Sequence, residues 1–587
     1  MSMPVSPLLM GAKSLNCPGI AAIHTQTKAT MIQSSTGPRS GVLRSGRAVD
    51  RTGVIGNRQA VISRRSGAFI LAALIVCGVA CSGANAAEKG RAEHVVVVVW
   101  DGMRPDFIRP QYCPNLYSLA TNGVFFLRHH AAYVSSTEVN GVALATGNHP
   151  GRSGIIANTE YRPELSTLAA VATEGADQVW RGDLMTAGNY IRTPTVAEIL
   201  QDAGIPTVVA GSKAVALLQD RSRQKRTPSE KESVTLFEGK TMPRSLGESL
   251  LRANDDKAWT TNITQPNTVQ DQWTTRSLVR GLWKDGVPKY SMLWLSDPDK
   301  SQHEAGVGSA TALAGIESSD KNLGEVIKVL GDKGVLDKTD IMVVSDHGFS
   351  TIQRGPDVVD ILKKQKFSAG KRFDNPEPGD VLVVGLGGSV FFYVIDHTEP
   401  VIQRLVSFLQ TSDFAGTIFS RLPIEGTFPM EAVRCGNTNG GPDVIVSLRW
   451  TTDKNENGAP GMMQSMDGTK GKGAHASLSR YDMNNSLVAS GPDFKKGFIS
   501  ELPSGNIDVG PTTLWLLGVK QPQPMDGRVL HEALISSGQS VAKPVTKTIE
   551  AKRDIGYLRW RQTLKFTEVG HAIYFDEGNG EPALLSE

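Results

Sequence analysis

Three segments of the chain are dominated by apolar residues instead of alternating between apolar and polar ones. They are His94–Trp100 (HVVVVVW), Tyr290–Leu295 and Asp340–Val344. Such runs are typical of parallel strands that are buried on both faces. Start and stop signals predict helices at Pro114–Thr121, Val139–Ala145 and Gly315–Leu330, and another that starts within Thr193–Val196 and runs to Ala203, with Thr193 or Thr195 near its cap. The alternation of strands and helices predicts an α/β fold with a doubly wound, mostly parallel sheet.

Residues 355–450 have a different pattern. Val381–Val384 and Ser389–Ile395 flank a Gly-rich stretch, which predicts a hairpin, and a helix is expected from Pro400 to Gln410. We therefore expect a smaller α+β subdomain to be inserted here into the α/β domain.

The predicted boundaries divide the chain into five parts. A leader with a signal peptide covers 1–87, the α/β domain covers 88–354 and 451–535, the inserted subdomain covers 355–450, and a C-terminal extension covers 536–587. Residues 451–474 are rich in Gly, Asn and Lys and are expected to form a loop. The extension is expected to contain a hairpin of Tyr557–Lys565 and His571–Phe575.

The leader has the pattern of an export signal. Two arginines precede the apolar run Ala68–Val76, which is too short to span a bilayer, and the small residues Ala84–Ala86 (ANA) offer a cleavage site. We expect an exported protein, periplasmic or secreted, that starts near Ala87 and has no transmembrane span. Lipidation at Cys81 is the weaker alternative, because the preceding residues lack the Leu that a lipobox carries.

Charge and cysteine content narrow the possible chemistry. The formal charge is +3, but residues 1–66 hold nine Lys/Arg and a single acid, Asp50, so the remainder is acidic. That part gives no electrostatic reason to expect a nucleic-acid-binding module. Only Cys113 and Cys435 lie beyond the leader, where they can form a disulfide or stay unpaired. No CxxC pair exists, so a metal would need His and carboxylate ligands.

Metal-capable side chains follow the predicted buried strands at their carboxyl ends, where open α/β sheets bind ligands. These residues, with one more from a Gly-rich segment (GKGAH), are Asp101, Asp299, His303, Asp346, His347 and His475. Each alone has an ordinary structural interpretation as a turn, a helix cap or an exposed loop. Together, three carboxylates and three imidazoles match two zinc-like ions with three protein ligands each.

The order of these motifs resembles that of the type I phosphodiesterase/nucleotide pyrophosphatase family in the alkaline phosphatase superfamily. The matching segments are VVVVVWDGMRPD, STEVNGVALATGNHPGRSGIIAN, WLSDPDKSQHEAG, VVSDHGFS, GAHAS and VASGPDFKKG. The resemblance implies an alkaline phosphatase-like fold and a zinc hydrolase of phosphate diesters or nucleotide pyrophosphate bonds. The alternatives on the same scaffold are an alkaline phosphomonoesterase and a phosphonoacetate-type hydrolase.

The resemblance also implies a role for each site residue. Its two zinc-ligand sets are Asp299, His303 and His475 for one ion, and Asp101, Asp346 and His347 for the other. Thr137 would contact the second ion and act as the nucleophile that forms a phosphothreonine, with Ser135 and Ser136 as competing candidates. Asn158 would donate to a phosphate oxygen. A bound cation suits this chemistry, because it makes a threonine hydroxyl reactive at neutral pH.

Two departures from the family pattern concern the substrate. The usual Thr-Phe-Pro-Asn reads Thr137-Glu138-Val139-Asn140 here, so the aromatic residue that would stack on a leaving group is a glutamate. In relatives that hold a dianionic monoester, a Lys-x-Arg pair supplies extra cations. The comparable stretch keeps Arg221 but has Gln219 in place of the lysine, and Lys213 is the residue that can compensate. A diesterase or pyrophosphatase is therefore the first hypothesis and a monoesterase the second.

The expected partner is a small-molecule phosphate ester, and the sequence leaves the oligomeric state open. An exported binding protein that keeps the fold without activity is the alternative from another class. The retention of all six metal positions and Thr137 argues against it. A sulfatase is disfavoured, because no Cys/Ser-x-Pro-x-Arg signature surrounds the nucleophile.

Overall fold

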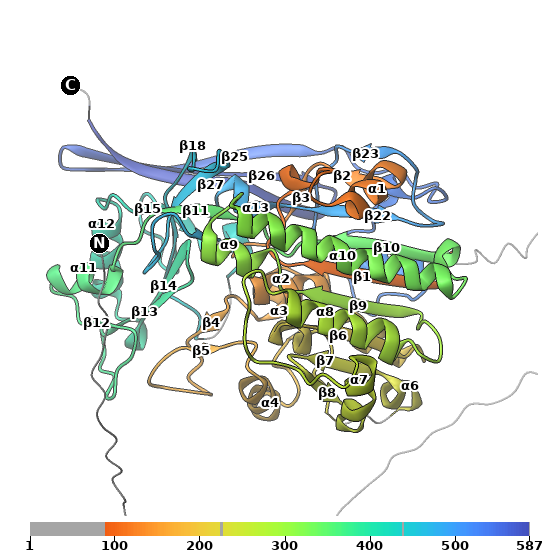
Figure 1. The fold of residues 1–587 in the computed structure, drawn as a ribbon. Helices are drawn as coiled ribbons and strands as arrows, with labels where there is room; N and C mark the ends of the chain where they lie inside the picture. The colour runs from red at the N-terminus through yellow and green to blue at the C-terminus, as the bar shows by residue number, and fades with distance from the viewer. Residues whose placement is uncertain (1–88, 224–226, 437–439, 586–587) are drawn as a thin grey trace, which may run out of the picture. The chain divides into compact units, whose positions relative to one another are not determined.

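The computed structural model describes residues 89–223, 227–436 and 440–585. Its largest sheet has nine strands in the order β23-β2-β22-β10-β1-β9-β6-β7-β8 (Figure 1). From β10 to β7 all neighbours are parallel, whereas β22 and β8 run antiparallel to the strands beside them. The strand bounds are β1 His94–Trp100, β2 Val124–Phe126, β6 Thr207–Gly211, β7 Val234–Phe237, β8 Lys240–Met242, β9 Tyr290–Leu295, β10 Thr339–Val344, β22 Leu487–Ser490 and β23 Phe498–Ser500.

Strand β1 is buried on both faces. Val95, Val97 and Val99 belong to one apolar cluster, whereas Val96 and Val98 belong to another on the opposite face. Helices α2, α5 and α14 contribute to the first cluster, and α1, α8 and α10 to the second. Their bounds are α1 Pro114–Asn122, α2 Thr137–Thr146, α5 Val196–Asp202, α8 Thr268–Arg276, α10 Ala310–Asp332 and α14 Asn506–Leu516. Helices on both faces confirm the doubly wound α/β prediction, and they explain why β1 lacks polar alternation.

A second sheet lies within the segment that was expected to form the inserted subdomain. Its order is β12-β13-β14-β17-β15-β16, and helices α11 and α12 share its apolar cluster. The bounds are α11 Val358–Lys364, β12 Ala369–Gly370, β13 Val381–Gly385, β14 Ser389–Val394, α12 Glu399–Leu409, β15 Ala415–Ser420, β16 Phe428–Pro429 and β17 Val444–Leu448. The antiparallel pairing of β13 with β14 confirms the predicted hairpin. The domain boundaries themselves stay a prediction.

The loop expected at residues 451–474 is wrong, because this segment contributes strands to a four-stranded sheet. The order is β18-β19-β11-β20, in which β11 directly follows the carboxyl end of β10. The bounds are β11 Ser350–Arg354, β18 Trp450–Lys454, β19 Pro460–Gln464 and β20 Gly473–Ala474. Pairing with a distant strand supplies hydrogen bonds that the polar composition does not signal. The sheet also brings the residue after β20 next to the end of β10.

The C-terminal extension contains the predicted hairpin, with longer strands than expected, and a third antiparallel strand precedes it. The three strands are β25 Val545–Ile555, β26 Leu558–Val569 and β27 Ala572–Leu584. Trp560 and Phe575 are buried, the first in the core of the second sheet, so β26 packs against it.

The sequence predicts a cleaved leader and no transmembrane span, and it leaves the pairing of the two cysteines open. The leader and the cleavage site near Ala87 lie outside the described residues. In the part of the chain that the structure describes, no helix is long and apolar enough to cross a membrane. Cys113 and Cys435 are both buried and unpaired, which decides between the two alternatives for the cysteines.

Candidate active site

Three neighbouring parallel strands carry the acidic residues to one edge of the large sheet. Asp101 directly follows β1, Asp299 begins helix α9 (Asp299–Ala305) after β9, and Asp346 follows β10. Since β10, β1 and β9 are adjacent and parallel, their carboxyl ends meet. The Asp299 amide donates to the Asp101 carbonyl at 2.8 Å, which joins the two strand ends. All three carboxylates are buried.

The six metal-capable residues form two groups of three. Asp299, His303 and His475 make one group, and Asp101, Asp346 and His347 make the other; the candidate ligand atoms of each group lie within 4.8 Å of one another. In the first group, Asp299 Oδ1 lies 3.2 Å from His303 Nε2 and 3.5 Å from His475 Nε2. In the second, His347 Nε2 lies 3.5 Å from Asp101 Oδ1 and 3.3 Å from Asp346 Oδ2. The two groups have the same members as the two zinc-ligand sets that the family resemblance implies, and their binding of metal stays a prediction.

Backbone carbonyls fix the orientation of all three imidazoles. The Nδ1 atoms of His303, His347 and His475 lie 2.9–3.0 Å from the carbonyls of Gly473, Gly348 and Ser135 respectively. A carbonyl only accepts, so each Nδ1 carries the hydrogen and each Nε2 presents its lone pair. This is the arrangement that metal-binding histidines commonly adopt.

Each carboxylate has one buried oxygen that faces the imidazole lone pairs. Asp101 Oδ1, Asp299 Oδ1 and Asp346 Oδ2 receive no hydrogen bond from any residue within the described ranges. Burial, and then repulsion from Asp346, raises the pKa of Asp101 to about 7, and burial raises that of Asp346 to about 7. Buried acceptors that face only other acceptors are unfavourable unless a cation lies between them. The donor set therefore fits two divalent metal ions.

Lys213 lies against the same cluster. It follows β6, and its Nζ lies 2.8 Å from Asp101 Oδ2, 3.2 Å from Asp299 Oδ2 and 3.4 Å from Thr137 Oγ1. Burial lowers the pKa of Lys213, but the neighbouring aspartates outweigh burial and hold it well above its usual value. Its ammonium is therefore a fixed positive charge beside Thr137.

Thr137 is the first residue of the buried helix α2 and faces the second metal-capable group. Its Oγ1 lies 3.3 Å from His347 Nε2. Of the competing hydroxyls, Ser135 Oγ donates to the Ser477 carbonyl at 2.7 Å, so it is engaged away from the cluster. Ser136 forms the N-cap of α2, and its buried Oγ has no hydrogen-bond partner in the described ranges. Of these three hydroxyls, that of Thr137 contacts the cluster, through His347 and Lys213.

The asparagine of the Thr-x-x-Asn motif holds the turn before Thr137 in place. Asn140 Nδ2 donates to the carbonyls of Ala132 and Ser136, each at 3.1 Å, and its Oδ1 accepts from the Ala132 amide at 2.7 Å. Asn506 Nδ2 donates to the same Oδ1 at 3.0 Å and also to the carbonyl of Asp346. Asn140 therefore has a positioning role that sequence reasoning did not assign, although the motif contained the signal.

Asn158 lies beside the start of the same helix. Its Oδ1 accepts from the Glu138 amide at 3.2 Å. This contact orients the side-chain amide next to Thr137, and its Nδ2 is the group that can donate to a phosphate oxygen.

Comparisons with known proteins agree with this geometry. The family model of type I phosphodiesterase/nucleotide pyrophosphatase matches residues 95–410, more than half of the chain. The chain belongs to this family. Human ectonucleotide pyrophosphatase/phosphodiesterase family member 7 is 22% identical over 51% of this chain and 56% of its own length. The mouse family member 3 is 21% identical over 43% of this chain and 24% of its own length. The chain thus matches about half of the first relative and a quarter of the second.

Solved structures of the family share the fold. Human ectonucleotide pyrophosphatase/phosphodiesterase 5 matches with a TM-score of 0.52 and 15% identity, over 76% of this chain and 100% of that one. Its murine counterpart, an inactive threonine-to-alanine variant in complex with AMP, matches with a TM-score of 0.51 and 17% identity, over 74% of this chain and 97% of that one. The predicted resemblance to the type I phosphodiesterase/nucleotide pyrophosphatase family is confirmed.

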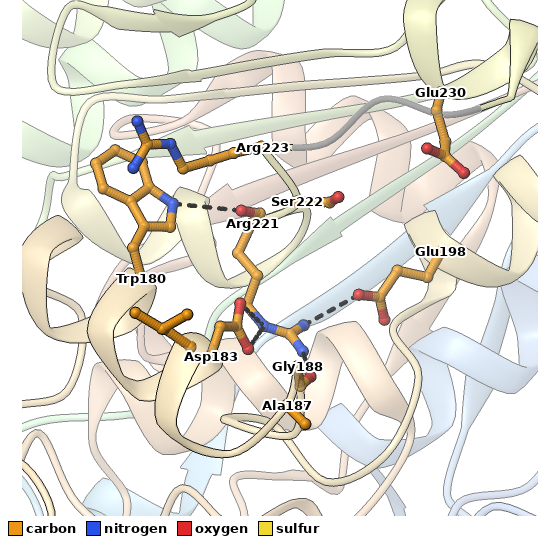
Figure 2. Close-up of a pocket in the computed structure, with 10 residues that line it drawn as sticks. Trp180, Asp183, Ala187, Gly188, Glu198, Arg221, Ser222, Arg223 and Glu230 are labelled. Atoms are coloured by element: carbon orange, nitrogen blue, oxygen red, sulfur yellow. Dashed lines mark hydrogen bonds and ion pairs between the residues drawn. The ribbon is translucent and has the colours of Figure 1, made fainter. Parts of the chain in front are cut away.

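Arg221, unlike Lys213, binds residues away from the two metal-capable groups. Its Nε and Nη1 atoms each lie 3.1 Å from a carboxylate, of Asp183 and Glu198 respectively, and Nη2 donates to the Gly188 carbonyl at 2.8 Å (Figure 2). These residues line a separate cavity of about 780 Å³. The two carboxylates and the Gly188 carbonyl engage all three guanidinium nitrogens. Arg221 therefore has no free pair of N–H donors for bidentate binding of a phosphate. A role for Arg221 in substrate binding stays a prediction, and these contacts do not support it.

Glu138, the residue in place of the family's aromatic, is buried beside a second acid that sequence reasoning missed. Its carboxyl contacts that of Glu174, which lies between β5 (Val171–Ala172) and α4 (Ala176–Met185). Burial, and then the negative charge of Glu174, raises the pKa of Glu138 well above its usual value. Glu174 lies in no motif, so no local signal marks it.

Proposed function

We propose that this protein hydrolyses phosphate diesters or nucleotide pyrophosphate bonds through a phosphothreonine at Thr137. The observation that carries the proposal is the position of Thr137 Oγ1, at the amino end of buried helix α2 and 3.3 Å from His347 Nε2 in one of the two ligand groups. Family membership supports the same reaction class.

The six ligands would hold two zinc ions, which suit imidazole and carboxylate donors in sets of three. When bound, such ions lower the pKa of a hydroxyl and neutralise the charge that develops on phosphoryl oxygens. A phosphate bound between the two groups would also meet the amino end of α2, where free N–H groups and the helix dipole favour an anion.

The chain's own residues then account for attack and for charge stabilisation. Thr137 Oγ attacks phosphorus after losing its proton, and the bond to the leaving oxygen breaks. Lys213 Nζ lies 3.4 Å from Thr137 Oγ1, where its ammonium stabilises the negative charge on the attacking oxygen. Asn158 Nδ2 donates to a non-bridging phosphoryl oxygen. Water subsequently cleaves the phosphothreonine and restores the hydroxyl.

A monoesterase is the second candidate, because Lys213 provides one positive charge next to the nucleophile. A phosphate dianion needs more positive charge than a diester monoanion does. The test is a comparison of kcat/KM for bis(p-nitrophenyl) phosphate and p-nitrophenyl phosphate on protein of measured metal content. We expect the diester to be preferred. A higher value for the monoester would select the second function, and no turnover of either would refute both.

The site of action is proposed to be outside the cytoplasm. The export signal, with its cleavage site at Ala84–Ala86, supports this location. Mass spectrometry of exported protein is expected to find an N-terminus near Ala87. An intact leader would contradict the proposal, whereas a lipid-modified Cys81 would contradict only the cleavage site near Ala87.

A further inference from the structure

A single buried side chain, that of Asn506, contacts both halves of the proposed active site. Asn506 is the first residue of helix α14, and its Nδ2 donates to Asn140 Oδ1 at 3.0 Å and to the Asp346 carbonyl at 2.5 Å. Asn140 belongs to the Thr-x-x-Asn motif that starts at Thr137, whereas Asp346 belongs to the second metal-capable group. One carboxamide thus connects the turn of the proposed nucleophile to a candidate metal ligand.

The surroundings of Asn506 allow one orientation of its carboxamide. The Asp346 carbonyl only accepts, so the atom that faces it is the amide nitrogen. On the other side, Oδ1 accepts from His129 Nε2 at 3.0 Å and from Asn485 Nδ2 at 3.3 Å. The nitrogen and the oxygen of the carboxamide therefore have two partners each, and an apolar side chain at this position would leave several buried polar groups unpaired.

The other contacts of the two partners are local. Asn140 otherwise binds backbone groups in the turn before Thr137, and Asn485 binds the backbone beside Asp346. Helices α2 and α14 also share an apolar cluster, but apolar packing is not directional. The two hydrogen bonds from Asn506 Nδ2 therefore set how the turn before Thr137 lies against the end of β10.

The start of α14 is itself held by the C-terminal extension. Asp508 Oδ2 accepts from the Gly505 amide at 2.9 Å and from the hydroxyl of Tyr574, in β27, at 2.8 Å. Tyr574 is buried in the same apolar cluster that α2 and α14 share. Asn506 and these supports lie outside residues 95–410, so a part of the chain that the family model does not match fixes this contact.

We propose that Asn506 is a positioning residue for the proposed reaction. By joining Asn140 to the Asp346 carbonyl, it fixes the distance between the Thr137 hydroxyl and the second metal-capable group. Asn506 belongs to neither ligand group, so its effect passes through its two partners. The inference rests on the proposed function and adds a residue on which the reaction depends.

The first test replaces Asn506 by leucine, which has a similar size and branching but no hydrogen-bonding atoms. Turnover of bis(p-nitrophenyl) phosphate is measured at saturating zinc, and zinc binding is measured without substrate by competition with a chromogenic chelator. We expect kcat to fall on the order of 10–100-fold with little change in KM, because the hydroxyl is misplaced. One of the two zinc ions should bind more weakly by a similar factor, as happens when a residue that orients a metal ligand is lost.

Asn254→Leu is the matched control. Asn254 is also buried, and its Nδ2 also donates two hydrogen bonds, to the Leu250 carbonyl at 2.9 Å and to Ser277 Oγ at 2.8 Å. All three residues lie outside both metal-capable groups. The control should lose stability towards urea, as Asn506→Leu does, but it should keep kcat and both zinc affinities.

A double-mutant cycle tests whether Asn506 acts through Asn140. Asn140→Ala alone should also lower kcat, because the turn before Thr137 loses its anchor. If the two residues act through their shared contact, the double variant loses less activity than the product of the two single losses. Independent residues would give the full product.

The outcomes separate this inference from the proposed function. Wild-type kcat and zinc affinities in Asn506→Leu, with only its stability lowered, would show a structural role and overturn the inference, and so would a full product in the cycle. Wild-type protein that does not cleave the diester would refute the proposed function; unchanged zinc binding in Asn506→Leu would then overturn the link to Asp346 as well. If Asn506→Leu does not fold, Asn506→Ser replaces it in every measurement, because serine is too short to reach both acceptors.

Discussion

The two ends of strand β10 both carry buried acids, and their surroundings distinguish a candidate metal site from a structural pair. At the carboxyl end, Asp346 and Asp101 face the lone pair of His347. At the amino end, Asp340 contacts Asp493, whose backbone amide donates to Asp340 Oδ1 at 3.2 Å. The acids at the carboxyl end offer a site for a cation. Asp340, at the amino end, is instead next to another acid and a backbone donor.

The amino-end pair is stabilised without a metal. The Asp493 carboxylate accepts from the amides of Arg91 and Ala92 at 2.7 and 2.9 Å, so backbone donors engage it. Burial, and then the charge of Asp493, raises the pKa of Asp340 to about 9. Asp340 therefore holds a proton at neutral pH, and it can donate this proton to its neighbour.

Burial alone does not identify a functional acid in this protein. It raises the pKa of Asp101 and Asp346 to about 7, and that of Asp340 to about 9. The difference lies in the partners, because only the carboxyl-end acids face imidazole Nε2 atoms held in the ligand orientation. A raised pKa thus needs the right neighbours before it indicates chemistry.

The largest effect is expected at the carboxyl end from Thr137→Ala. Removal of the attacking hydroxyl should lower kcat by several orders of magnitude, because an unpositioned water loses both activation and orientation. The variant should keep its fold and metal content, since all six ligands remain. Thr137→Ser should retain partial activity. Single-turnover kinetics with a trapped phosphoenzyme would measure this, and near-normal turnover of Thr137→Ala with an inactive Ser136→Ala would contradict the assignment.

Removal of a metal ligand should distinguish the two ends of β10 most directly. Asp346→Ala and His303→Ala are expected to lose metal and activity together, because three-ligand sites do not tolerate the loss of one ligand well. The activity loss should be at least on the order of the 10²–10³-fold cost of a single transition-state donor. Elemental analysis alongside rate measurements is the check. Asp340→Asn is the matched control and should keep both, whereas active protein without metal would refute the site.

A smaller loss is expected from Asn158→Ala. One transition-state hydrogen-bond donor is removed, which typically costs on the order of 10²-fold in kcat. Metal content should not change, because Asn158 belongs to neither ligand group. Steady-state kinetics would show an effect on kcat greater than on KM. A change confined to KM would indicate that Asn158 only binds the ground state.

The smallest effect is expected at the amino end and concerns stability, not activity. In the unfolded chain, an aspartate has a pKa of about 3.9, whereas that of Asp340 in the folded protein is about 9. The folded state thus binds one more proton between these values. The contribution of Asp340 to the free energy of unfolding is therefore fully present below about pH 4, and it is lost as the pH rises towards 9.

Asp340→Asn should therefore flatten the pH dependence of the free energy of unfolding. The change for one proton is at most about 1.4 kcal/mol per pH unit between pH 4 and 9. Urea denaturation at several pH values would measure it. An unchanged slope would mean that Asp340 is ionised in the folded protein.

The sequence by itself determined the central strands, the helices around them and the six metal-capable residues. These features depend on local information, because continuous apolar runs predict buried parallel strands and parallel neighbours end at one edge of a sheet. His475 is a partial exception. Its motif is visible in the sequence, but the composition of residues 451–474 predicts a loop where the structure has the strands that carry His475 to the end of β10.

Only the tertiary structure decided which charged residues meet. Lys213 and Arg221 were equal candidates in the sequence, yet Lys213 lies against Asp101 and Arg221 is bound by Asp183 and Glu198. The contact between Glu138 and Glu174 is equally invisible in the chain order. Long side chains on loops reach several partners, and the choice depends on the distances and on the burial that the whole fold creates. Apolar patterning along the chain carries no information about that choice.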